Sequence, residues 1–229
     1  MTLFYVGLSY GSIQNSELHQ EGRRILRCLD QQASPVESPL EIENGGRPYF
    51  GDHHADFSIS HTKQAVAVSY LTSDPAPAGP LFRTGCDIQY LQPQKSSGAL
   101  GSFFFHASER DFLAASASEA EGLHRFFRIW VLKEAYLKIR GLSVFDMRRC
   151  PAFSFDDPAA GKYGFPEDDT EATNLEFFLY ETGSYALGVC REIGEAGISL
   201  EPEVRWFSPE TLPLNRVAKI KAAVSSVKP

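Results

Sequence analysis

The sequence lacks the residue patterns that cross-link or metallate small secreted domains. Its 229 residues include four cysteines, none in a CxxC pair, and their spacing fits no zinc signature. Lys and Arg number 22 against 29 Asp and Glu, a net charge of −7, which argues against a general nucleic-acid-binding surface. No apolar run approaches the roughly 18 residues of a membrane span, and no signal peptide is recognisable. We expect reduced cysteines, a cytoplasmic location, and neither nucleic acid nor membrane as partner.

The residues that are present predict an α+β fold. Hydrophobic residues make up 43% of the chain, with 17 Phe. The predicted helices span residues 16–32, 108–117 and 119–140, with a short amphipathic helix or frayed tail at 214–227. The predicted strands span residues 3–8, 57–61, 65–71, 81–88, 175–180, 185–190 and 204–207. Because these elements do not alternate regularly, they favour α+β over a doubly wound parallel sheet.

A stretch of small and polar residues near the middle of the chain suggests a division into two subdomains, residues 1–100 and 101–229. Residues 156–174 are acidic and rich in Gly and Pro, and include the run Glu167 to Asp169. We expect a solvated loop there.

Glu134 does not fit the helix that contains it. Leu123, Phe126, Phe127, Trp130 and Leu137 form one apolar stripe, and Glu134 falls in the middle of it. A carboxylate in such a position is costly to bury without a cation. A surface pair between Glu134 and Lys138 is the simpler alternative, but a solvated pair does not belong in an apolar stripe. Residues 121–149 also hold seven basic and three acidic residues, which suggests an anionic ligand.

Asp87 and Gln89 form a second candidate group. In a strand they point to the same face, while Cys86 and Ile88 point to the other. Together with Glu134 they offer two carboxylates and one amide oxygen, the kind of donor set that Mg²⁺ accepts beside substrate phosphates.

Residues 52–61 contain three of the six histidines and allow two interpretations. His53, His54, Asp56 and His61 could hold a transition metal in a phosphohydrolase, although His53 and His54 are adjacent and no HExxH-like spacing occurs. Alternatively, the Ser60 hydroxyl and the His61 imidazole donate to phosphate oxygens.

Together these segments resemble the Sfp-type 4′-phosphopantetheinyl transferases. Gly46-Arg47-Pro48 resembles the family's GKP block, and residues 57–62, FSISHT, resemble FNISHS. Residues 85–89, GCDIQ, resemble GxDIE, and residues 130–138, WVLKEAYLK, match WxxKEAxxK. Residues 104–109, FFHASE, resemble the segment that precedes that helix. The ordered set, spanning residues 46–142, is far more specific than any single block.

The resemblance implies two similar subdomains related by a pseudo-twofold, with the active site in the cleft between them. It implies transfer of the 4′-phosphopantetheine arm of coenzyme A to a serine of an acyl or peptidyl carrier protein, with release of 3′,5′-ADP. Such two-subdomain members act as monomers, so we expect a monomer.

The resemblance also implies residue roles. Asp87 and Glu134 would hold Mg²⁺. The carrier serine then needs a general base, for which Glu134 or a metal-bound water next to it is the candidate. Lys138 would contact the attacked phosphate, and Lys133 the pyrophosphate. Arg47, Ser60 and His61 would bind the 3′-phosphate and nearby oxygens. The family's third acidic ligand is Gln89 here, so a water could replace it. Arg23, Arg24 and Arg27 are further candidates for the nucleotide.

Two alternatives from other classes remain at this stage. One is the metal-dependent phosphohydrolase built on residues Asp52 to His61. The other is a non-catalytic module that binds coenzyme A or a carrier protein, an alternative motivated by Gln89.

Overall fold

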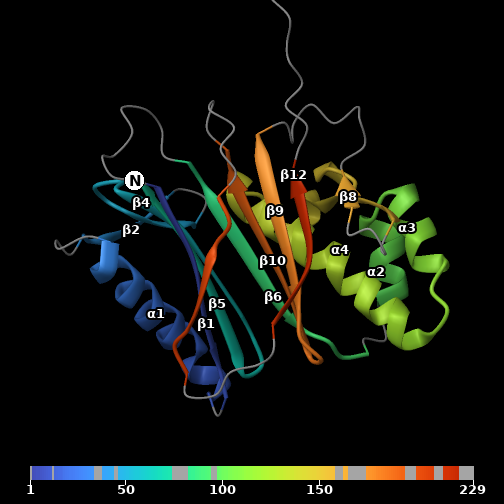
Figure 1. Ribbon diagram of the computed structural model, residues 1–229, viewed down its shortest axis with the longest axis horizontal. Helices are drawn as coiled ribbons and strands as arrows, with labels where there is room; N and C mark the ends of the chain where they lie inside the picture. The colour runs from blue at the N-terminus through green and yellow to red at the C-terminus, as the bar shows by residue number, and fades with distance from the viewer. Residues whose placement is uncertain are drawn as a thin grey trace, which may run out of the picture.

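The computed structural model describes residues 2–11, 13–33, 38–43, 46–73, 82–93, 97–157, 162–164, 174–193, 200–208 and 214–221. Within these residues, two four-stranded sheets occupy the centre, and a long helix flanks each of them (Figure 1). The fold is therefore mixed α/β, as the unalternating pattern of elements predicts.

The first sheet has the order β11-β1-β5-β4. Its strands are β11 (Glu203–Trp206), β1 (Thr2–Tyr10), β5 (Ala65–Ser73) and β4 (Ala55–Thr62). Helix α1 (Leu18–Ala33), which follows the 3₁₀ turn η1 (Asn15–Glu17), packs on this sheet. The residues that recur at helical spacing on α1 are buried against it: Leu18, Ile25, Leu26 and Leu29.

The second sheet has the order β12-β9-β10-β6. Its strands are β12 (Asn215–Lys221), β9 (Leu175–Glu181), β10 (Tyr185–Glu192) and β6 (Thr84–Tyr90). Helix α4 (Glu119–Arg140) packs on this sheet. Ser118 caps its start by accepting from the Glu121 N–H, and Gly141 ends it in the left-handed conformation at φ 64°.

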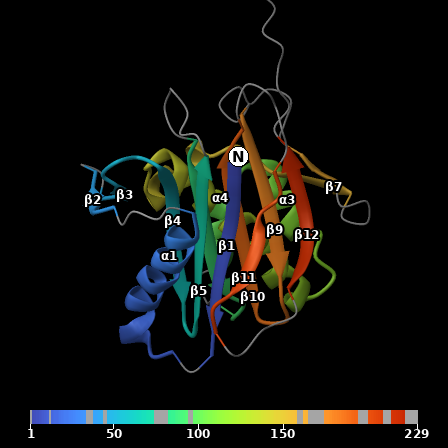
Figure 2. The same cartoon turned by 60° about the vertical axis from the view of Figure 1, so that its left-hand side comes forward.

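The two sheets also pack on each other. One apolar core contains Phe4, Val6 and Leu8 of β1 together with Phe178 of β9 and Leu187 of β10. This places α1 and α4 on opposite outer sides of the paired sheets (Figure 2). Apolar residues on both faces of the central strands explain why those strands are almost entirely buried.

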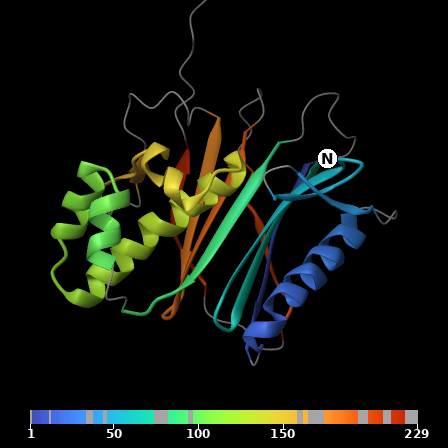
Figure 3. The same ribbon diagram turned by 180° about the vertical axis from the view of Figure 1, so that it is seen from behind.

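Strands β4 and β6 run side by side where the sheets meet (Figure 3). Alternate side chains of β4 accept from backbone N–H groups of β6: Asp56 from Thr84 at 2.7 Å, Ser60 from Ile88 at 3.3 Å, and Thr62 from Tyr90 at 3.4 Å. The Cys86 thiol donates to the Ser58 carbonyl at 3.3 Å. All four contacts join residues 28 positions apart, so the two strands lie in parallel register.

Shorter elements surround the sheets. Strands β2 (Leu40–Ile42) and β3 (Pro48–Phe50) form a hairpin, and so do β7 (Ser154–Asp157) and β8 (Lys162–Gly164). Helices α2 (Ser97–Phe104) and α3 (Ala107–Ala114) precede α4, and the 3₁₀ helix η2 (Val144–Arg149) follows it.

Three sequence predictions need correction. Residues 215–221 are a strand paired with β9, where a helix or frayed tail is predicted. Helix α3 begins one residue earlier and ends three residues earlier than predicted, and His106 and Glu109 form its capping box. The short helix α2 lies within a stretch that the sequence predicts only as polar and small. The acidic run Glu167 to Asp169 lies outside the described residues.

Sheet membership does not follow the predicted division of the chain at residue 100. Strand β6 belongs to the second sheet, and β11, from the last part of the chain, pairs in parallel with β1 in the first. The chain therefore crosses between the sheets at β6, at β11 and again at β12. The boundary at residue 100 stays a prediction.

Candidate active site

Asp87 is the centre of a polar cluster between the sheets. It lies on β6, is 3% exposed, and accepts a hydrogen bond from the Ser60 hydroxyl of β4 at 2.7 Å. Lys138, from the last turn of α4, forms an ion pair with Asp87 at 2.8 Å and also donates to the Cys86 carbonyl at 2.8 Å. Burial lowers the pKa of Lys138, but the combined effects of Asp87, Cys86 and Glu134 outweigh it and raise the pKa overall. Three predicted residues thus meet in one place, each from a different element.

Glu134 lies one turn before Lys138 on α4 and is half-buried. Burial, followed by repulsion from Asp87, raises the pKa of Glu134 to about 7, although Lys138 acts in the opposite direction. A carboxyl group with this pKa exchanges protons near neutral pH, as a general base requires. Glu134 is thus partly withdrawn from water without being fully buried.

The donor set fits Mg²⁺, the ion that the resemblance implies. Glu134 and Asp87 repel each other, so a divalent cation between them would stabilise both negative charges. Among the described residues, no group of three or more His, Cys, Asp or Glu side chains is arranged to hold a metal. Two carboxylates with waters and substrate oxygens are nevertheless a normal Mg²⁺ environment. Gln89 donates its amide to Asp87 at 3.0 Å, so in this arrangement it supports Asp87.

Ser60 and His61 point to opposite faces of β4, as adjacent strand residues must. Ser60 faces β6 and Asp87. His61 faces α1, where its Nε2 lies 3.3 Å from the Nε2 of His19. Burial, His19 and Lys138, in that order, lower the pKa of His61. The two residues therefore contact different sides of the region between β4, β6 and α1.

Arg47 is near the site, but its guanidinium is already occupied. It pairs with Asp56 at 2.6 Å and donates to the carbonyls of Phe57, Thr84 and Lys138. These contacts join the loop before β3 to β4, β6 and the end of α4. Arg47, Lys138 and Gly141 also line a cavity of about 250 Å³.

The structure does not bring Lys133 to this cluster. Its ammonium group is fully buried, pairs with Glu109 of α3 at 3.0 Å, and donates to the Pro151 carbonyl at 3.2 Å. Glu109 in turn accepts from the backbone N–H groups of His106 and Phe153. Lys133 therefore joins α4 to α3 and to the segment before β7, and it is not placed to contact a phosphate.

The residues of the phosphohydrolase alternative are also dispersed. His54 is bound between Asp52 and Asp30, Asp56 is paired with Arg47, and His61 contacts His19. His53 is exposed and stacks on Tyr49. None of these contacts arranges the four predicted side chains around one ion.

A cavity of about 770 Å³ lies between α1, the β2–β3 hairpin and β4, and shares Pro48, Phe57 and Ile59 with the 250 Å³ cavity. His19, Arg23 and Arg27 line it from α1, and His61 lines it from β4. The spacing of four residues puts the three α1 side chains on one helical face. His19 is absent from the sequence prediction, although this spacing could have indicated it.

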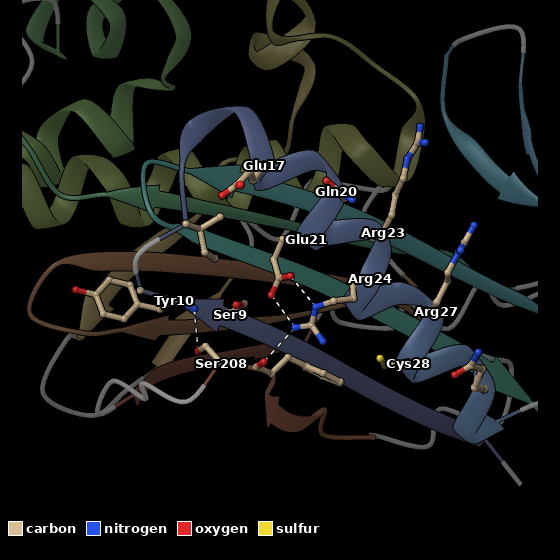
Figure 4. Close-up of a pocket in the computed structure, with 14 residues that line it drawn as sticks. Ser9, Tyr10, Glu17, Gln20, Glu21, Arg23, Arg24, Arg27, Cys28 and Ser208 are labelled. Carbon is tan, nitrogen blue, oxygen red and sulfur yellow. Dashed lines mark hydrogen bonds and ion pairs between the residues drawn. The ribbon is translucent and has the colours of Figure 1, made fainter.

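Arg23 and Arg27 form no ion pair with any described residue, whereas Arg24 pairs with Glu21 at 2.7 Å. Figure 4 shows the side chains of Arg23 and Arg27 extending away from the Arg24–Glu21 pair. The two arginines also border a larger cavity of about 1020 Å³ between α1 and the ends of β1 and β11. That cavity contains neither Asp87 nor Glu134.

The predicted excess of positive charge on residues 121–149 is neutralised by carboxylates from elsewhere in the chain. Arg128 pairs with Glu181, Lys133 with Glu109, and Arg140 with Glu192. Among the described residues, Arg148 of this segment and Arg23 and Arg27 of α1 have no carboxylate partner.

Known proteins connect this geometry to a family. Residues 83–190 match the model of the 4′-phosphopantetheinyl transferase superfamily, and this range includes Asp87, Glu134 and Lys138. The matched range is slightly less than half of the chain, and it shows similarity to that superfamily. Ser60 and His61 lie before the matched range, so their roles depend on the first-sheet geometry alone.

Three curated relatives agree with the superfamily match. The chain is 31% identical over 127 residues to the 4′-phosphopantetheinyl transferase pptA of Paxillus involutus, covering 49% of this chain and 48% of the relative. It is 31% identical over 129 residues to HetI of a Nostoc species, covering 52% and 50%. It is 29% identical over 148 residues to AcpT of Salmonella typhi, covering 61% and 72%.

The chain thus spans about half the length of the first two relatives. Separately, none of the helices described has the length and apolarity needed to cross a bilayer.

Proposed function

We propose that this protein is an Sfp-type 4′-phosphopantetheinyl transferase that uses Mg²⁺ and coenzyme A. Its acceptor would be a serine of an acyl or peptidyl carrier protein, and its second product 3′,5′-ADP. The observation that carries the proposal is the cluster of Asp87, Glu134 and Lys138, in which Lys138 pairs with Asp87 at 2.8 Å and Glu134, one helical turn before Lys138, interacts electrostatically with both. The superfamily match over the same residues supports it.

In this proposal the serine oxygen forms a bond to the phosphorus that carries the pantetheine arm, and the bond from that phosphorus to the bridging oxygen of the pyrophosphate breaks. Glu134, or a water held next to it, accepts the serine proton. Lys138 donates to an oxygen of the attacked phosphate, where negative charge accumulates. Mg²⁺ held by Asp87 and Glu134 would neutralise charge on the pyrophosphate.

The remaining contacts divide into two kinds. His61, Arg23 and Arg27 line the 770 Å³ cavity and would bind the phosphates of the nucleotide end. Ser60 and Arg47 are engaged with Asp87 and Asp56, so they would hold those carboxylates in place. This assignment differs from the prediction that Arg47 and Ser60 contact phosphate. It also leaves out Lys133, which is buried in an ion pair with Glu109.

We also propose that the molecule consists of two similar subdomains related by an approximate twofold, with the active site between them, acting as a cytoplasmic monomer. Each sheet carries one long helix, and the cluster draws Ser60 from the first sheet and Asp87 from the second. With a boundary at residue 100, β6 of the first subdomain lies in the second sheet, and β11 of the second subdomain lies in the first sheet. All four cysteines are free, which agrees with a reducing compartment.

The test is the mass of a purified apo carrier protein after incubation with the chain, coenzyme A and Mg²⁺. We expect the serine to gain the phosphopantetheine mass, and Glu134→Gln and Lys138→Met to lower kcat/KM by about 10²–10⁴-fold. Glu119→Gln, on the exposed first turn of the same helix, is the matched control and should keep full activity.

The outcomes separate the alternatives. Coenzyme A binding without modification of fatty acid, polyketide or peptide carriers, by a folded chain, would favour the non-catalytic module. If the folded chain neither binds coenzyme A nor modifies any of these carriers, the proposal is refuted.

A further inference from the structure

Two histidines from different elements meet at the edge of the 770 Å³ cavity. His19 is on the first turn of α1 and His61 is near the end of β4. Their Nε2 atoms lie 3.3 Å apart, and the rings meet edge to face with centroids 4.4 Å apart. The two imidazoles therefore approach each other closely at these nitrogens.

This separation matches that of two ligands on one tetrahedral ion. Zinc binds imidazole nitrogen at about 2.0–2.1 Å, so two nitrogens at the tetrahedral angle lie about 3.3–3.4 Å apart. A single N–H···N hydrogen bond between two neutral rings accounts for the same distance, and the experiment below distinguishes the two.

The elements that carry the histidines are held close together. Gly22 lies one turn after His19, and a Cβ built there would be 2.7 Å from the Ile59 Cγ2 on β4. Leu18, next to His19, is buried, and His61 is paired with Val66 in the ladder between β4 and β5. Because both backbones are fixed by packing, the two imidazoles are largely preorganised for a shared ligand.

We propose that His19 and His61 form a two-histidine site for a borderline divalent ion of the Zn²⁺ class. Imidazole nitrogen suits zinc, copper and nickel, whereas Mg²⁺ prefers oxygen. The site is therefore chemically distinct from the pair Asp87 and Glu134. Two protein nitrogens leave coordination positions open to water or to an anion in the cavity, where Arg23 and Arg27 also lie.

The consequence is a regulatory one. A metal ion on the Nε2 of His61 occupies the atom that would otherwise donate to a phosphate. Metal binding itself does not depend on transferase activity, so the site can be tested whether or not the proposed function holds.

The experiment titrates Zn²⁺ into the full chain, freed of metal with a chelator, by calorimetry in excess Mg²⁺. We expect one Zn²⁺ per chain, with affinity lowered at least 10-fold in His19→Gln and in His61→Gln. His53→Asn removes an exposed histidine elsewhere and keeps a residue that tolerates its φ of 54°, so it should bind as the unsubstituted chain does. Cys28→Ser tests whether Zn²⁺ binds instead to Cys28, the one cysteine that is not fully buried.

A second measurement uses Cu²⁺ on the unsubstituted chain, so it does not depend on how the variants fold. We expect its electron paramagnetic resonance spectrum to show coupling to two imidazole nitrogens, and this coupling to fall to one nitrogen in His19→Gln. Three results would each overturn the proposal. They are a zinc affinity that His19→Gln leaves unchanged, a zinc affinity that is lost in Cys28→Ser, and a copper spectrum without coupling to two nitrogens.

Discussion

At residue 89 a neutral amide faces a carboxylate, and this contact can report on the proposed Mg²⁺ position. Gln89 donates to Asp87 at 3.0 Å. Gln89→Glu would replace that donor with a second negative charge, which destabilises the metal-free chain. A divalent cation at Asp87 would relieve the repulsion. We therefore expect Mg²⁺ to raise the Tm of Gln89→Glu by more than it raises the Tm of the unsubstituted chain.

Gln64→Glu, in the exposed turn between β4 and β5, adds the same charge far from Asp87 and serves as the control. Its response to Mg²⁺ should equal that of the unsubstituted chain. An equal response in Gln89→Glu as well would show that no Mg²⁺ binds beside Asp87.

A second residue-scale prediction concerns His54, which is bound on both sides. Its Nε2 lies 2.6 Å from Asp30 and its Nδ1 lies 2.5 Å from Asp52. The hydrogen bond to Asp30 is the largest effect and raises the pKa of His54. Burial acts in the opposite direction, and the hydrogen bond to Asp52 raises the pKa further. Tyr70 also donates to Asp30 at 3.0 Å, so this cluster joins α1, β5 and the segment before β4.

The sign of the pH effect follows from that direction. Because the pKa is raised in the folded state, the stabilisation is complete below the unfolded value of about 6.5 and is lost as pH rises through the folded value. We expect the difference in unfolding free energy between the unsubstituted chain and His54→Gln to shrink from pH 6 to pH 9 in urea titrations. His53→Asn is the control, and a difference independent of pH would contradict the prediction.

At the scale of elements, α4 lies unusually close to the sheet beneath it. A Cβ on Gly188 of β10 would be 2.5 Å from the Val131 carbonyl oxygen of α4. Backbone cannot move aside as a flexible side chain can, so Gly188→Ala should force the helix outward. We expect a loss of about 1–3 kcal/mol in the free energy of unfolding, measured in urea.

Gly183→Ala provides the matched control in the turn between β9 and β10, because no atom lies within 4 Å of its added Cβ. Its effect should stay within about 0.5 kcal/mol of zero. Equal effects of the two substitutions would show that α4 does not rest directly on β10.

The sequence predicts elements best where one pattern decides them. The helix predicted over residues 119–140 agrees with α4 to the residue. Asp87, Glu134 and Lys138 could be predicted because they lie in ordered motifs. The partner of Lys133 could not, because the ion pair with Glu109 depends on how α3 folds back on α4.

Other failures have the same origin in tertiary contacts. Residues 215–221 are equally compatible with a short helix or a strand, and pairing with β9 decides between them. The alternating polar residues of β4 suggest a solvent-facing side, yet Asp56, Ser60 and Thr62 receive backbone donors of β6. A polar face turned toward another strand looks the same in sequence as one turned toward water.

At the scale of the whole molecule, the chain crosses between the sheets three times, at β6, β11 and β12, and this should make unfolding cooperative. Strand β6 lies in the second sheet although most of its preceding chain forms the first, and β11 returns to pair with β1. Neither sheet with its helix is a continuous piece of chain. The apolar core between the sheets also draws on both of them. Unfolding one half would therefore expose the core of the other.

The two tryptophans allow this to be measured, because they report on different halves. Trp206 is on β11 in the first sheet, and Trp130 is on α4, which packs on the second. In the single-tryptophan variants Trp130→Phe and Trp206→Phe, fluorescence and circular dichroism should give coincident urea transitions within each variant, because both halves unfold together. The comparison within one variant removes any difference in stability between the two substitutions. The prediction is contradicted if, in either variant, the fluorescence transition occurs at a lower urea concentration than the loss of helix. One sheet would then unfold before the other, and the crossings of the chain would not couple the two sheets.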